Sequence, residues 1–215
     1  IMLRPLREIG NLVEILADER ITAVCLGPGL GLDDAARAKV TAVLAAERAV
    51  VLDADGLSAY ADDPATLFDQ LHEACVLTPH AGEFARLFPD IAEKLNARAT
   101  KGPVFSKADA TREAAARAGC TVLFKGPDTV IANETGQSAI NSSAYDRSAP
   151  WLATAGSGDV LAGFIAGLLA RGFAPMDAAE TAAWLHTECA LKFGPGLIAE
   201  DLPETLPAVF RDLGL

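Results

Sequence analysis

Residues 156–159 have the composition of an anion-binding helix start, because Gly-Ser-Gly-Asp precedes a long apolar run. Glycine lets the backbone approach a ligand without an obstructing Cβ. The first N–H groups of a helix have no intrahelical acceptor, and the helix dipole adds partial positive charge. Such a start suits the charge that develops in phosphoryl transfer, with Asp159 placed to accept a hydroxyl proton. An ordinary capped helix explains the same residues.

Two further segments have ligand-binding composition and follow predicted strands. Residues 27–31 read Gly-Pro-Gly-Leu-Gly, without the spacing of a dinucleotide fingerprint or a Walker loop. Asp53 and Asp55 end the next strand, where two carboxylates could share a water-coordinated Mg²⁺ or raise one another's pKa. A tight turn explains the first segment equally well, and a solvated strand end with Asp55 capping a helix explains the second.

His80 and Lys125 also lie just after predicted strands. Ligands of open α/β sheets bind outside the carboxyl ends of strands, so His80 is a better site candidate than the other two histidines. Lys125 could contact a phosphate. The alternatives are a structural histidine and a β-hairpin turn at residues 125–129, which Gly, Pro and Asp also favour.

These candidates must be positioned by alternating strands and helices. Nearly apolar strands followed by helical patterns predict a parallel sheet covered by helices on both faces, and turn signals near 126 and 135 predict an antiparallel extension. The predicted strands are 22–26, 49–52, 75–77, 121–125, 129–132 and 138–141. The predicted helices are 33–47, which Asp33 could cap, 64–73, 83–99, 107–118, 158–171 and 175–192.

Composition limits the class of protein. The chain has 215 residues, of which 51% are hydrophobic, and its net charge is −11, which disfavours a general nucleic-acid binder. Four scattered cysteines without metal-ligand spacing are typical of reduced thiols in the cytoplasm. The longest apolar run, 160–170, is too short to span a membrane, and we expect its Gly163-x-x-x-Gly167 spacing to serve close helix packing. We predict one domain over residues 1–215.

Five ordered motifs together resemble the ADP/ATP-dependent NAD(P)H-hydrate dehydratases of the ribokinase-like superfamily. The resemblance extends from about Ile21 to Leu206 and rests on residues 24–31, 51–57, 77–84, 123–126 and 152–163. It implies a three-layer α/β/α fold with a mostly parallel central sheet. It also implies a hydro-lyase that restores NADH or NADPH from the S epimer of its hydrate, using ADP or ATP and Mg²⁺.

The resemblance also implies roles for individual residues. Asp159 matches the family's hydrate-contacting aspartate and is expected to be the general base. The expected hydrate contacts are Gly29, Gly31, His80 and Asp159. The expected nucleotide contacts are Lys125, Gly126, Pro127, Asp128, Thr129, Gly156, Ser157 and Gly158. No metal ligand is assigned.

The chain departs from the family pattern in three places. We expect the N-terminal segment that carries the first strands and one wall of the hydrate pocket to lie outside this sequence. Gly56 and Ser58 replace an expected Ala and Asn, and residues 142–150 are longer and more polar. The alternatives are a sugar or vitamin-alcohol kinase of the same superfamily and a truncated, inactive nucleotide-binding module. The expected partners are other copies of the chain, a tetramer being one arrangement, and an epimerase domain fused upstream or separate.

Overall fold

The computed structural model describes residues 3–6, 8–98 and 102–215, and a six-stranded sheet in the order β1-β2-β3-β4-β5-β6 forms its centre. The first four strands are parallel, and the last two extend the sheet as an antiparallel meander. This topology confirms the predicted α/β class. The strands are β1 (Ala23–Leu26), β2 (Ala49–Leu52), β3 (Cys75–Leu77), β4 (Thr121–Phe124), β5 (Asp128–Ala132) and β6 (Ser138–Ser142).

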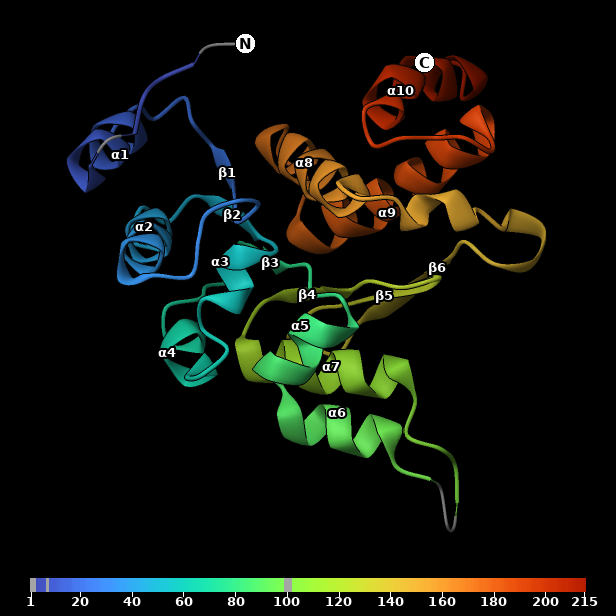
Figure 1. Cartoon of the computed structure of the whole chain (residues 1–215), viewed down its shortest axis with the longest axis horizontal. Helices are drawn as coiled ribbons and strands as arrows, with labels where there is room; N and C mark the ends of the chain where they lie inside the picture. Colours follow the sequence, from blue (N-terminus) through green and yellow to red (C-terminus); the bar gives the residue numbers. More distant parts are fainter. Residues whose placement is uncertain (1–2, 7, 99–101) are drawn as a thin grey trace.

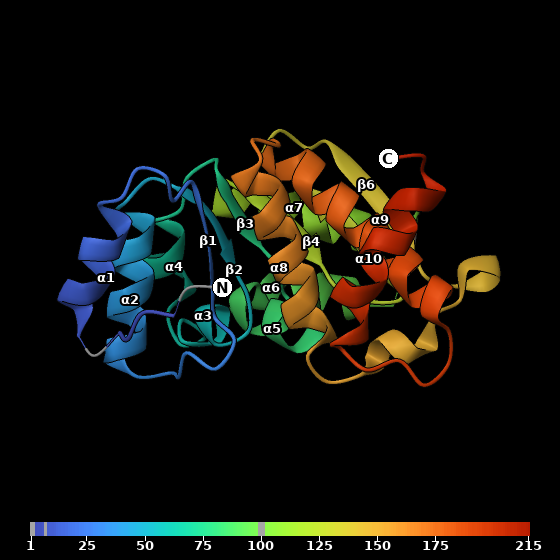
Figure 2. The same cartoon turned by 90° about the horizontal axis from the view of Figure 1, so that it is seen from above.

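Helices cover both faces of the sheet, as Figures 1 and 2 show. On one face Leu52 and Leu77 pack with α2 and α4 to α7, whereas on the other Val51 and Val76 pack against α8 and α9. Successive strand residues point to opposite faces, so nearly apolar strands are what a three-layer domain requires. The helices are α1 (Ile9–Leu16), α2 (Asp34–Leu44), α3 (Asp55–Ser58), α4 (Pro64–Phe68), α5 (Ala81–Leu87), α6 (Pro89–Asn96), α7 (Lys107–Ala118), α8 (Ser157–Ala170), α9 (Pro175–Phe193) and α10 (Asp201–Asp212).

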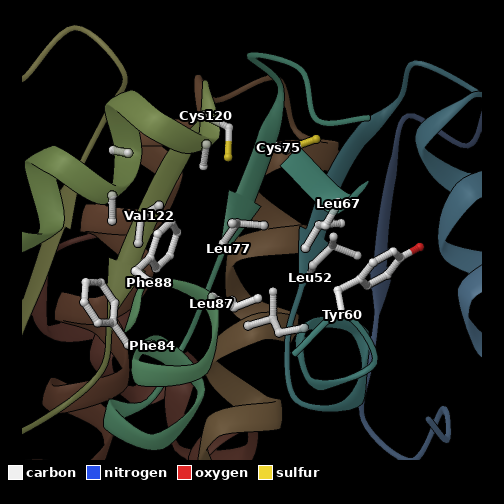
Figure 3. Close-up of a cluster of buried hydrophobic side chains, with 14 of the residues drawn as sticks. Leu52, Tyr60, Leu67, Cys75, Leu77, Phe84, Leu87, Phe88, Cys120 and Val122 are labelled. Atoms are coloured by element: carbon white, nitrogen blue, oxygen red, sulfur yellow. The ribbon is translucent and has the colours of Figure 1, made fainter. Parts of the chain in front are cut away.

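An aromatic cluster fixes α5 beneath the sheet. Phe84 stacks on Phe124 of β4 with ring centroids 4.1 Å apart, and Phe88 lies 5.1 Å from Phe84. Figure 3 shows Phe84 and Phe88 close to Val122, together with the buried thiols of Cys75 and Cys120. All four cysteines are free. The cluster holds the first turn of α5 at the carboxyl end of β3.

Several predicted helix boundaries were wrong. The predicted helix at 83–99 is divided in the described residues, because α5 ends at Leu87 and α6 begins at Pro89, and residue 99 lies outside the described residues. Proline lacks an N–H and forces the preceding residue out of helical geometry, which is why Phe88 has φ −132° and ψ 61°. Helix α4 ends at Phe68, earlier than predicted, and helices α1, α3 and α10 were not predicted. Asp33 caps α2 as expected, accepting from the Ala36 amide.

The apolar run 160–170 lies within α8, but its two glycines do not make the expected helix contact. Both are exposed, and a Cβ added to either would meet nothing within 4 Å. Leu161 and Ile165 provide the packing face instead, because they lie on the opposite side of the helix against the sheet. Within the described part of the chain, no helix has the length and hydropathy needed to cross a membrane.

Candidate active site

Loops from separate strands meet at the carboxyl edge of the parallel sheet. The Lys125 amide donates to Pro79 O at 2.9 Å, which joins the β4 end to the β3 end. Gly27 follows β1 with φ 145°, and a Cβ there would lie 1.7 Å from Asp53 O, so only glycine permits this approach between the ends of β1 and β2. This edge is where open α/β sheets bind ligands.

The Lys125 ammonium is paired with carboxylates at this edge of the sheet. Its Nζ is 2.6 Å from Asp53 Oδ1 and 3.9 Å from Glu83 Oε2. Asp53 is only 1% exposed, and its Oδ2 is buried with no hydrogen-bond partner among the described residues. Buried carboxylate oxygens normally have a partner, so this one points to a missing cation or donor.

The start of α8 faces Lys125. Gly156 precedes the helix in the left-handed conformation with φ 83°, and a Cβ added to Gly158 would lie 3.4 Å from Lys125 Nζ. The next residue, Asp159, is exposed in the first helical turn. The Ser157 hydroxyl instead donates to Leu152 O at 2.6 Å, which anchors the loop before the helix. The site therefore combines first-turn N–H groups, an ammonium and an accessible carboxylate.

His186 of α9 supports this helix start and was not predicted. Its Nε2 lies 2.9 Å from the carbonyl oxygen of Ser157, which can only accept, so Nε2 carries the proton. Burial lowers the pKa of His186 to about 4, so the ring is neutral near pH 7. No sequence motif marks His186, because 29 residues separate it from Ser157 and only helix packing brings the two together.

His80 is a helix cap. Its Nδ1 accepts from the amides of Gly82 and Glu83, and Glu83 Oε2 accepts from the His80 amide, which completes a capping box at α5. Its side chain is 55% exposed, and Nε2 lies 3.5 Å from Glu83 Oε1. Nδ1 therefore has the structural role of a helix cap. The exposed edge of the ring is accessible, and the substrate contact of His80 stays a prediction.

The side chains of Asp53 and Asp55, which follow β2, have different partners. Asp55 Oδ2 accepts from the Gly31 amide at 2.9 Å, which fixes the 27–31 loop, whereas Asp53 turns to Lys125. Ala54 between them has φ 47° and ψ −119°, a conformation that costs a non-glycine residue about 1–3 kcal/mol. The two carboxylates therefore do not share one site, because the chain leaves strand geometry at Ala54. Gly29 stays exposed in the same loop.

A cavity of about 420 Å³ opens beside Gly158 and Lys125. Its lining comes from the β4–β5 turn, β6, residues 143–153 and the facing sides of α8 and α9. Of the residues expected to contact nucleotide, six line it: Lys125, Gly126, Pro127, Thr129, Ser157 and Gly158. Asp128 and Gly156 do not line it, although they lie within the same two segments. Residues Asn141, His186 and Thr187 line it without having been predicted.

The comparisons with known proteins agree on one family. The sequence profile described as NAD(P)H-hydrate dehydratase matches residues 2–207. The bifunctional NAD(P)H-hydrate repair enzyme of Salinibacter ruber is 37% identical over 204 residues, which cover 90% of this chain and 34% of that protein. The enzyme of the same name from Synechocystis sp. is 41% identical, with coverage of 91% and 36%. The chain thus spans about a third of the length of these curated relatives.

Solved structures give the same fold. The ADP/ATP-dependent NAD(P)H-hydrate dehydratase of Bacillus subtilis, co-crystallised with ATP and Mg²⁺, matches with a TM-score of 0.71 and 28% identity, covering 93% of this chain and 69% of that one. A ribokinase-like protein of Enterococcus faecalis matches with a TM-score of 0.74 and 25% identity, covering 98% and 69%. A hydroxyethylthiazole kinase of Pyrococcus horikoshii shares the fold alone, at 18% identity and a TM-score of 0.68, covering 93% and 75%. These likenesses confirm the expected ribokinase-like architecture.

Proposed function

This chain belongs to the NAD(P)H-hydrate dehydratase family, and from that premise we propose that it restores NADH or NADPH from the S hydrate in a step driven by ADP or ATP. The observation that carries the proposal is the position of Gly158. A cavity of nucleotide size lies on one side of it, and the exposed carboxylate of Asp159 follows it in the first turn of α8. Donor and acceptor of a phosphoryl group can therefore meet at one helix start.

Each proposed step follows from the groups at this point. The hydrate hydroxyl oxygen attacks the terminal phosphorus, its proton passes to an Asp159 oxygen, and the nucleotide oxygen leaves with the electron pair of the broken P–O bond. First-turn N–H groups of α8 and the Lys125 ammonium stabilise the charge on the transferring group. The ring nitrogen then expels phosphate, a better leaving group than hydroxide, and the adjacent ring carbon gives a proton to the departed phosphate, which restores the double bond.

The residues present fit a magnesium ion. No group of three or more His, Cys, Asp or Glu side chains in the described ranges could cage a metal. Mg²⁺ normally needs only one or two carboxylates, with substrate phosphates and waters completing its shell. The unpartnered Asp53 Oδ2 and the neighbouring Glu83 carboxylate would hold it. When bound, the ion would neutralise the negative charge of the nucleotide phosphates. The Lys125 ammonium balances the negative charge of Asp53.

The partners of the chain are also part of the proposal. The names of the relatives call them bifunctional, and we infer that their second activity is that of an epimerase domain outside the span matched here. We further propose that residues 1–215 form one dehydratase domain that assembles as a homo-oligomer in the cytoplasm. Sedimentation velocity of the chain would test the oligomer, since a monomer at micromolar concentration would contradict it.

One assay separates the proposed function from its alternatives. The chain is incubated with hydrated NADH, Mg²⁺ and ADP or ATP, and both nicotinamide absorbance and nucleotide consumption are followed. Recovery of absorbance that requires nucleotide is the expected result. A kinase of sugars or vitamin alcohols would consume nucleotide only with such an alcohol present. An inactive module would bind nucleotide without turnover, and either outcome would overturn the dehydratase assignment.

A further inference from the structure

Lys107 opens α7 and extends its side chain to the β4–β5 turn. Its Nζ donates to Asp128 O at 2.6 Å and to Lys125 O at 3.2 Å. The same ammonium lies 4.5 Å from the ring centroid of Phe124, the last residue of β4. Three contacts therefore join the first residue of one helix to the two ends of the turn expected to hold nucleotide.

The surroundings of Lys107 are unusual for a lysine. The residue is half-buried, and within the described ranges no carboxylate lies at ion-pair distance from its ammonium. Burial lowers the pKa of Lys107, while the nearby Asp128 charge opposes that shift. Backbone carbonyls and an aromatic ring thus offset the desolvation of this cation in place of an acidic partner.

The contacts of Lys107 complete a pattern in the turn. Each of the four carbonyl oxygens of residues 125–128 accepts a hydrogen bond from the protein. Lys107 Nζ donates to the carbonyl oxygens of Lys125 and Asp128. Thr129 Oγ1 donates to Gly126 O at 3.0 Å, and the amide and hydroxyl of Ser143 both donate to Pro127 O. Carbonyl oxygens repel phosphate, so binding them to protein donors makes the turn more favourable for an anion.

Gly126 lies directly against the Lys107 ammonium. A Cβ at this position would lie 2.6 Å from Lys107 Nζ, closer than side-chain contacts allow. Gly126 does not have the positive φ that would itself demand glycine. The space it leaves is occupied by the lysine, so any larger residue would displace the ammonium from the turn.

We propose that Lys107 is a positioning residue, which acts through the turn 125–129 and sets the Lys125 and Gly126 groups for the nucleotide phosphates. The inference rests on the proposed nucleotide-dependent function and goes beyond it, because Lys107 does not line the cavity. Without its ammonium, two carbonyls lose their donor and the turn samples other conformations. Nucleotide binding then weakens, while the chemistry of a bound nucleotide continues.

The test compares Lys107→Met, Lys107→Arg and the control Lys94→Met by ADP titration calorimetry and steady-state kinetics. Lys94 pairs with Glu113 on the neighbouring surface and has no contact with the turn. We expect Lys107→Met to weaken ADP binding about tenfold, the usual effect of losing a hydrogen bond to a charged group. KM for nucleotide should rise by a similar factor while kcat at saturation stays within about twofold. Lys107→Arg should restore most of the affinity, and Lys94→Met should match wild type.

The outcomes distinguish this inference from the proposed function. Wild-type chain that binds neither ADP nor ATP would overturn the proposed function. Wild-type chain that binds ADP, with folded Lys107→Met binding equally tightly, would overturn the role of Lys107 alone. A loss in kcat of Lys107→Met without a change in the KM for nucleotide would also overturn the role of Lys107. Circular dichroism reports folding, and if Lys107→Met does not fold, Lys107→Gln decides instead: ADP affinity equal to wild type would contradict the inference.

Discussion

At the scale of single residues, two aspartates of the site have opposite surroundings. Asp53 is buried and paired with Lys125, whereas Asp159 is exposed at the start of α8. An exposed carboxylate can reach a substrate hydroxyl and exchange its proton with solvent afterwards. A buried, paired carboxylate is suited to hold a cation in place. These surroundings are the reason that we propose Asp159 as the base and Asp53 as a charge that holds a cation.

Asp159→Asn removes the basic oxygen and keeps the size of the side chain. Turnover should fall by about 10²–10⁴, the usual contribution of a general base. The free energy of unfolding should change by about 1 kcal/mol or less, because only a helix-dipole interaction is lost. The matched control is Asp177→Asn, since Asp177 holds the same position in the first turn of α9. Near wild-type turnover in a folded Asp159→Asn chain would refute the assigned mechanism.

Asp53→Asn leaves the Lys125 ammonium with only the more distant Glu83 carboxylate. Breaking a buried ion pair by removing one partner typically destabilises a protein by several kcal/mol, and we expect about 3 kcal/mol here. Urea denaturation should show a lower midpoint with an unchanged slope. Asp55→Asn is the control, because an amide oxygen can still accept from Gly31. Equal midpoints for the two variants would show that the Asp53–Lys125 pair contributes little.

At the scale of elements, the site depends on how α8 and α9 pack. The first turn of α8 would point its N–H groups at a ligand only if its loop is fixed, and His186 of α9 bonds that turn at Ser157 O. Trp151 Nε1 donates to Ala190 O of the same helix at 2.8 Å, which holds the segment before α8. Helix α9 therefore supports the first turn of α8 and the segment before it.

The buried His186 makes stability depend on pH. Its pKa is about 4 in the folded chain and 6.5 in an unperturbed imidazole, so between these values the unfolded chain binds a proton that the folded chain excludes. The free energy of unfolding should therefore fall as pH falls from about 6.5 to about 4, by up to about 3 kcal/mol. His186→Gln keeps an N–H donor and does not titrate. Its unfolding free energy, measured by urea titration at each pH, should vary less over this window than that of wild type. Parallel curves would contradict the assigned cause.

At the scale of the whole molecule, the cavity joins segments from two layers of the fold. Residues 125–129 include the turn that joins β4 to β5 and the start of β5, whereas Ser157 and His186 belong to the helical layer above the sheet. A ligand in the cavity therefore contacts both layers in the folded chain and neither in the unfolded chain. Binding of that kind shifts the folding equilibrium toward the native state.

ADP should stabilise the chain measurably. At a concentration of about 100 times its Kd, a ligand that binds only the folded state adds about 2.7 kcal/mol to the free energy of unfolding. For a domain of this size that corresponds to a rise in Tm of about 5–10 °C. Differential scanning fluorimetry with increasing ADP and Mg²⁺ would measure the shift, with inorganic phosphate as the control. A Tm that is independent of ADP would count against a nucleotide site.

The sequence alone determined the layered α/β architecture and placed the candidate loops at the ends of strands. Strand interiors buried on both faces must be apolar, so the runs at 49–52 and 75–77 were recognisable and their bounds confirmed. Local rules also identified the Asp33 cap and the start of α8, because caps and helix starts depend on neighbouring residues. The ordered motifs identified the family because each motif is a short run of neighbouring residues.

Only the tertiary structure decided which side chains act together. Asp53 and Lys125 are 72 residues apart, and their pairing follows from the order of β2, β3 and β4 in the sheet. Period-two geometry predicted that Asp53 and Asp55 would point to one site, but Ala54 leaves strand geometry and separates them. His186 and Lys107 have no motif around them, and packing alone brings their polar atoms to Ser157 and to the turn. Local sequence fixes the elements because propensity and capping are local, whereas these contacts depend on how distant elements pack.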